Sequence, residues 1–156
     1  MTLNGGAAIT PSLRFEAGVA WNDGKITNPT PEFSLIAARS GTMRIPNIAR
    51  IVARGEIKWH HDLGRGRKLE ANAYARYTGR SRLGVGPHLA EAQGNYLDSG
   101  LALRLADDRR ALSLAVTNLS DSVGNRFAFG APLATGAEQL TPLRPRTVRL
   151  GVEIDF

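Results

Sequence analysis

The sequence predicts an all-β fold: an antiparallel up-and-down meander of about six long strands that forms part of a transmembrane β-barrel. Three observations support this prediction. Apolar and polar residues alternate along six segments, these segments are long, and the connections between them are alternately long and short. Glycine (17) and proline (8) punctuate the 156 residues. The expected strands are residues 12–22, 48–60, 68–80, 96–106, 111–118 and 146–156.

The first three segments separate apolar from charged residues, because neighbouring side chains of a strand point to opposite faces. Every second position is uncharged from Leu13 to Trp21, from Ile51 to Trp59 and from Leu69 to Tyr77. Charged residues occupy positions of the opposite phase. They include Arg14, Glu16, Arg50, Arg54, Glu56, Lys58, Glu70 and Arg76.

The last three segments repeat this alternation, with uncharged positions from Leu97 to Leu105, from Leu112 to Val116 and from Val148 to Phe156. Arg104 and Arg149 have the opposite phase. A helix competes over residues 97–117, but the leucines of the fourth segment step by two, which favours a strand. Across all six segments the apolar phase carries no charge, although 22% of the chain is charged.

The connections predict where the sheet lies. They contain about 25, 7, 15, 4 and 24 residues in chain order, so every long connection falls at one end of the sheet. Transmembrane barrels have this arrangement, with short periplasmic turns and long extracellular loops. The strands also have the length that a tilted span of the hydrocarbon core requires. We therefore expect the outer membrane of a Gram-negative bacterium as the location, with outer-membrane lipid as a partner.

This placement assigns roles to the two faces. The apolar face meets lipid, with interfacial aromatic residues at Phe15, Trp21, Trp59 and Tyr77. The charged face lines the lumen, where opposite charges pair. The expected lumen-facing residues are Arg50, Arg54, Glu56, Glu70, Arg76, Arg104 and Arg149. Alternation alone also fits a soluble barrel or sandwich that binds a small molecule.

Composition and motifs exclude several other functions. The net charge is +6, but the charges are spread along the chain, so no nucleic-acid partner is expected. There is no cysteine. His60 and His61 point to opposite faces of a strand, so no metal site is expected. We find no convergent polar cluster of the kind an enzyme needs, and we expect neither catalysis nor a cofactor.

Several segments resemble TonB-dependent receptors. Residues 146–156 resemble the terminal strand of bacterial outer-membrane barrels, which ends in an aromatic residue. The resemblance implies that Phe156, Ile154 and Val152 form the signal recognised by the barrel-assembly machinery. Residues 118–121, Asn-Leu-Ser-Asp, followed by Pro-Arg-Thr at 145–147, are similar to the end of the penultimate strand, although Ser120 replaces the usual aromatic residue. Residues 43–50 resemble a proline-containing strand entry of the same family.

The resemblance implies that residues 1–156 are the C-terminal portion of a larger barrel. We find no signal peptide, plug domain, TonB-binding segment or earlier strands in the sequence, so we expect a fragment or a truncated reading frame. A full receptor imports a scarce nutrient, such as a ferric siderophore, and only the full-length receptor engages the TonB complex. An oligomer of several copies that together close a membrane barrel is an alternative. No substrate-binding residue is identified.

Overall fold

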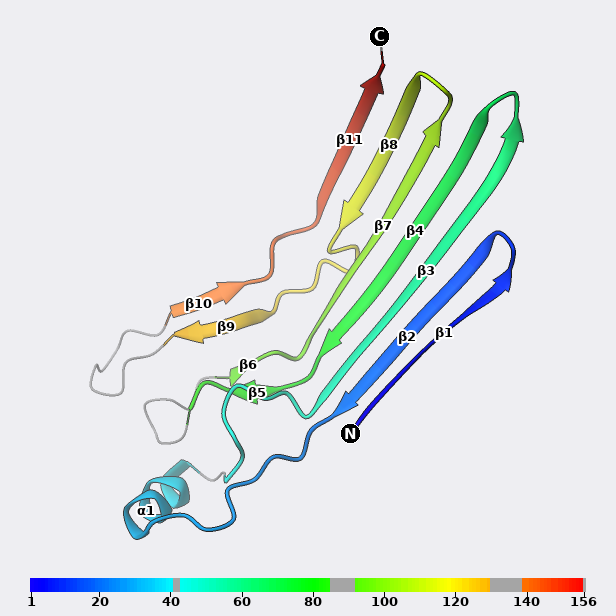
Figure 1. Cartoon of the computed structure of the whole chain (residues 1–156). Helices are drawn as coiled ribbons and strands as arrows, with labels where there is room; N and C mark the ends of the chain where they lie inside the picture. Colours follow the sequence, from blue (N-terminus) through cyan, green and yellow to red (C-terminus); the bar gives the residue numbers. More distant parts are fainter. Residues whose placement is uncertain (41–42, 85–91, 130–138, 156) are drawn as a thin grey trace.

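Seven segments of alternating hydropathy form one antiparallel sheet in the order β1-β2-β3-β4-β7-β8-β11 (Figure 1). This computed structural model describes residues 1–40, 43–84, 92–129 and 139–155. Each strand pairs antiparallel with its neighbours. The all-β class and the antiparallel sheet are therefore confirmed. The seven strands are β1 (Thr2–Thr10), β2 (Leu13–Trp21), β3 (Ile51–Gly64), β4 (Arg67–Thr78), β7 (Tyr96–Ala106), β8 (Arg110–Thr117) and β11 (Thr147–Ile154).

The first strand was not predicted, and it raises the number of strands in the main sheet from about six to seven. β1 pairs with β2 from Thr2 opposite Ala20 to Thr10 opposite Leu13. Pro11 and Ser12 make the turn between them, and the fixed φ of Pro11 suits a tight reversal. Two glycines and two alanines in the middle of β1 weaken its hydropathy pattern.

The third strand lies later in the chain than predicted. β3 begins at Ile51 instead of residue 48 and continues to Gly64 instead of residue 60. The reversal from β3 into β4 uses residues with positive φ. Gly64, Arg65 and Gly66 have φ values of 75°, 55° and 72°. Two of the three are glycines, which adopt this conformation without steric cost.

The connections are sorted as the sequence predicted. Short turns at one end of the sheet join β1 to β2, β3 to β4 and β7 to β8, and the three long connections lie at the other end (Figure 1). The long connections contain secondary structure of their own. They hold α1 (Pro31–Ser40), the pair β5 (Ser81–Arg82) and β6 (Ala92–Gln93), and the pair β9 (Asn125–Phe129) and β10 (Gln139–Pro142).

The helix α1 was not predicted, although its start has a recognisable signal. Thr30 caps it: the amide of Phe33 donates to Thr30 Oγ1 over 3.3 Å. Pro31 occupies the first turn, where its missing N–H costs no hydrogen bond, and Glu32 complements the helix dipole.

Few side chains of the described residues are buried. Among the described residues, the buried hydrophobic side chains are three alanines, Ala37, Ala49 and Ala111, and no side chain is fully buried. The described segments place no second layer of protein over either face (Figure 1). Backbone hydrogen bonds between strands therefore hold the sheet together, and apolar side chains remain in contact with the surroundings.

Candidate functional site

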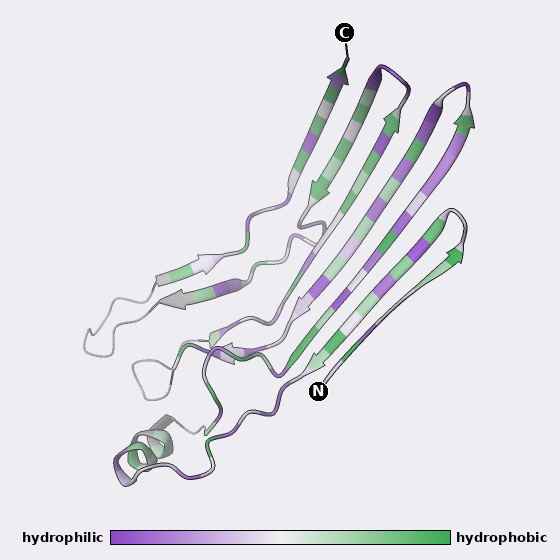
Figure 2. Cartoon of the chain, viewed as in Figure 1, coloured by the Kyte–Doolittle hydropathy of each residue, from purple (hydrophilic) through white to green (hydrophobic). Residues whose placement is uncertain are grey.

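The strand register gathers the apolar residues on one continuous face of the sheet. One row crosses all seven strands without a polar residue. It consists of Ala7, Phe15, Ile57, Ala73, Leu101, Val116 and Val148. Figure 2 shows the resulting bands of alternating hydropathy along the strands. On β11 the exposed fractions of this face reach 76% at Leu150 and 70% at Val152.

The four predicted aromatic residues belong to this apolar face. Phe15 pairs with Ile57, and Trp59 pairs with Leu13, near the short-turn end. Trp21 and Tyr77 lie at the end of the long connections, where β2 and β4 terminate. The aromatic residues thus lie toward the two ends of the sheet.

The opposite face carries the charged residues. The six strand residues among those predicted to face a lumen share it, because they have the phase opposite to the apolar row. Arg54 pairs with Arg76, and Glu70 pairs with Arg104. Glu56 pairs with Tyr74, and Arg149 pairs with Ala115.

Ion pairs and hydrogen bonds link this charged face across strands. Glu56 accepts a hydrogen bond from Asn72 Nδ2 over 3.1 Å and lies 3.3 Å from Lys58 Nζ. Arg104 lies 2.8 Å from Glu153 and 3.8 Å from Glu70. The ion-paired side chains are between 34% and 68% exposed, so solvent screens each ion pair and it contributes little to stability. Their arrangement instead defines a polar surface.

Arg50 differs from the other six predicted lumen residues. It precedes β3, and its guanidinium carbon lies 4.5 Å from the centroid of the Trp21 ring. Trp21 pairs with Ile51 on the apolar face. The Arg50 guanidinium therefore lies against Trp21 at the end of the apolar face.

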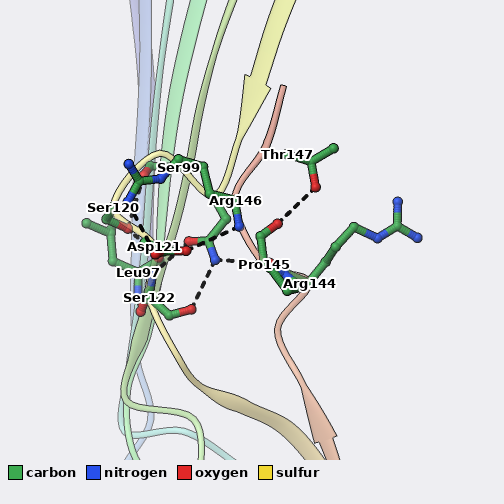
Figure 3. A network of polar contacts seen from close by, with 10 residues as sticks. Leu97, Ser99, Ser120, Asp121, Ser122, Arg144, Pro145, Arg146 and Thr147 are labelled. Atoms are coloured by element: carbon green, nitrogen blue, oxygen red, sulfur yellow. Dashed lines mark hydrogen bonds and ion pairs between the residues drawn. The ribbon is translucent and has the colours of Figure 1, made fainter. Parts of the chain in front are cut away.

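The Asn-Leu-Ser-Asp segment that follows β8 forms a polar network with the entry to β11 (Figure 3). Asn118 is 4% exposed and has a φ of 50°. Its Nδ2 donates to the backbone oxygens of Ser122 and Arg144, each over 3.0 Å. Its Oδ1 accepts from the amide of Ser122 over 2.9 Å. One side chain thus joins the exit of β8 to the approach of β11.

The neighbours of Asn118 extend the network in both directions. Asp121 accepts from the amide of Arg146 over 3.2 Å and forms an ion pair with its guanidinium over 3.3 Å. Ser120 Oγ donates to the backbone oxygen of Leu97 over 3.2 Å. The network therefore connects β7, β8 and β11 (Figure 3). Leu119 is exposed and makes its backbone contact with Ser99.

At the short-turn end, Asp107 organises the turn between β7 and β8. Its Oδ1 accepts hydrogen bonds from the amides of Arg109 and Arg110, over 3.0 and 2.9 Å. These bonds, the one from Arg109 first, lower the pKa of the Asp107 carboxyl below its ordinary value of 3.8. The positive charges of Arg110 and Arg67 act in the same direction.

Two sets of residues remain, the adjacent histidines of β3 and the expected assembly signal at the end of the chain. His60 pairs with Glu70 and His61 with Leu69, so the two imidazoles lie on opposite faces. His61 stacks on Trp59, with ring centroids 5.8 Å apart. Within the described ranges, no group of three or more metal-ligating side chains is present. Val152 and Ile154 lie on β11, whereas Phe156 falls outside the described residues.

Comparison of the chain with protein-family models, curated proteins and solved structures finds no match. In the part of the chain that the structure describes, no helix is both long enough and apolar enough to cross a membrane.

Proposed function

We propose that the chain is the C-terminal portion of the barrel of a TonB-dependent receptor in the outer membrane of a Gram-negative bacterium. The complete receptor imports a scarce nutrient such as a ferric siderophore, using the TonB complex. In this proposal the apolar face contacts outer-membrane lipid, and the barrel-assembly machinery recognises the last strand. The chain itself has no enzymatic role.

The exposed apolar face carries the proposal. A sheet in water must cover such a face with a second layer, because exposing it forgoes about 25 cal/mol for each Å² of apolar area. None of the described segments covers it. Acyl chains of a bilayer are a suitable cover for a face on which Arg110, opposite Ile154, lies only at the short-turn end. The sorted connections and the aromatic ends point to the same solvent.

Two adjacent residues of β7 provide a direct test. Leu103 belongs to the apolar face and Ala102 to the charged face, and both are exposed. Because the chain has no cysteine, Leu103→Cys and Ala102→Cys each offer one labelling site. Each variant is labelled with an environment-sensitive fluorophore and reconstituted into phosphatidylcholine vesicles whose acyl chains carry a quencher. Ile57→Cys and Lys58→Cys on β3 repeat the comparison.

The labels at residues 103 and 57 should emit at shorter wavelength and be quenched by the acyl chains. Those at residues 102 and 58 should remain in water. Equal quenching at both members of a pair would contradict the assignment of the faces. A monodisperse protein that stays in solution without detergent would favour the soluble small-molecule binder instead.

A further inference from the structure

A groove of about 380 Å³ lies at the end of the sheet where the long connections are. Its walls are residues 44–51, which lead into β3, and residues 77–84, which lead out of β4. Four arginines line it: Arg44, Arg50, Arg80 and Arg82. No acidic residue is among the described residues of the lining. This concentration of guanidinium groups favours an anionic occupant.

The same groove has an apolar part that continues the apolar face of the sheet. Ile45 and Ile48 line one wall, and their exposed fractions are 42% and 44%. Ile51 and Tyr77 form its border with the strands, and their register partners Trp21 and Ala53 lie on the apolar face. A ligand in the groove therefore meets cations and aliphatic surface together.

Two contacts orient the positive charge. The Arg50 guanidinium stacks over Trp21, which brings a cation to the end of the apolar face. Arg44 Nη2 lies 3.4 Å from a carboxylate oxygen of Asp23, which also pairs with Lys25 over 3.5 Å. The four arginines thus come from two segments, residues 44–50 and 80–82, and line one groove.

Asn47 holds the two walls together. Its amide donates to the backbone oxygen of Arg82 over 2.8 Å, and its Nδ2 donates to that of Leu83 over 3.2 Å. Its Oδ1 accepts from Gln93 Nε2 over 2.7 Å. With a φ of 59°, Asn47 adopts a left-handed conformation that asparagine tolerates. The groove is therefore preorganised by its backbone.

We propose that this groove binds the phosphate headgroup of an anionic lipid, with an acyl chain along the isoleucines. Guanidinium groups bind phosphate oxygens in pairs of parallel hydrogen bonds, which suits a cluster of arginines. The inference rests on the proposed function, because the membrane places this end of the apolar face at the lipid headgroups. A free phosphate is also an anion, but it would leave the aliphatic wall of the groove uncovered.

The test uses Trp21, which lies beneath Arg50. In a Trp59→Phe background Trp21 is the only tryptophan of the chain. The full chain is reconstituted into phosphatidylcholine vesicles that contain a small fraction of brominated phosphatidic acid or of brominated phosphatidylcholine. Bromine quenches a nearby indole, so quenching of Trp21 measures local enrichment of the brominated lipid. Inorganic phosphate is added in a parallel series.

We expect brominated phosphatidic acid to quench Trp21 more strongly than brominated phosphatidylcholine at the same fraction. The double variant Arg80→Ala/Arg82→Ala should lower this preference about 30-fold, the factor expected for two arginines at an anionic surface. Arg126→Ala/Arg144→Ala is the matched control, because it removes two arginines of the long connection between β8 and β11, whose described residues do not line the groove. It should keep the preference.

The outcomes separate the two proposals. Equal quenching by both lipids, with the label at residue 103 still quenched by lipid, would overturn the groove assignment alone. Absence of lipid quenching at residue 103 would overturn the membrane proposal and the groove with it. Inorganic phosphate that displaces phosphatidic acid at equal concentration would show a site for a free anion and overturn the lipid assignment. An equal loss in the control would show a diffuse charge effect and also overturn it.

Discussion

Replacing Asn118 tests whether a single buried side chain fixes the entry of β11. Asn118→Gly keeps the left-handed backbone at φ 50° but removes the three hydrogen bonds with Ser122 and Arg144. At about 1 kcal/mol for each bond, the free energy of unfolding should fall by about 3 kcal/mol. Asn118→Ala should lose about 1 kcal/mol more, because a Cβ disfavours the left-handed region.

The measurement is equilibrium unfolding by denaturant in detergent micelles, followed by tryptophan fluorescence. Ser120→Ala is the control, because it removes one exposed hydroxyl of the same network, which donates to Leu97 over 3.2 Å and accepts a long hydrogen bond from Ser99 over 3.4 Å. It should cost less than about 1 kcal/mol. Two results would contradict this role of Asn118. One is a loss in free energy of unfolding for Asn118→Gly no larger than that for Ser120→Ala, and the other is an Asn118→Ala variant more stable than Asn118→Gly.

Three further predictions concern other parts of the chain. The folded state lowers the pKa of Asp107, so its ionised carboxyl stabilises the fold fully above the unfolded pKa, and this stabilisation is lost as the pH falls through the folded pKa. In Asp107→Asn, the free energy of unfolding measured against pH should therefore fall less steeply at acid pH. Gly100→Ala should lower the free energy of unfolding by about 1–3 kcal/mol in the same assay, because its Cβ would lie 2.5 Å from the Tyr74 ring. Gly5→Ala is the control: its Cβ would meet nothing within 4 Å, so this variant should be neutral or slightly stabilising. Deleting Phe156 should reduce the heat-modifiable, folded fraction in outer membranes when the full-length receptor is expressed, and an unchanged fraction would count against the assembly signal.

The long strands could be predicted from sequence because, along the alternating part of each predicted segment, charged residues occur on only one of the two faces. β7 was placed at residues 96–106, and the structure has Tyr96–Ala106. β1 was missed because its centre consists of glycine and alanine, which contribute little hydropathy contrast. A tight turn at Pro11 and the alternation of Leu3, Ala7 and Ile9 were the available signals.

The groove could not be predicted from sequence because its contacts join distant segments. Asn47 bonds to Arg82, Leu83 and Gln93, which lie more than 30 positions away along the chain. No local periodicity encodes such a pairing. The same limit applies to Asn118, whose motif was noticed for its resemblance to a strand end, whereas its bond to the Arg144 carbonyl emerges only in three dimensions.

The edges of the sheet tie the proposed location to the proposed architecture. Within the described residues, β1 and β11 each pair on one side only. In hydrocarbon every unpaired backbone group costs several kcal/mol, so both edges must pair in a bilayer, with further strands or with the edges of other copies of the chain. The apolar face requires a bilayer or a second layer of protein, and a bilayer requires that both edges pair. Further strands that close a barrel meet both conditions at once. A closed barrel would therefore satisfy the edges and the face with one structure, whereas a sandwich in water would need a second sheet over the apolar face.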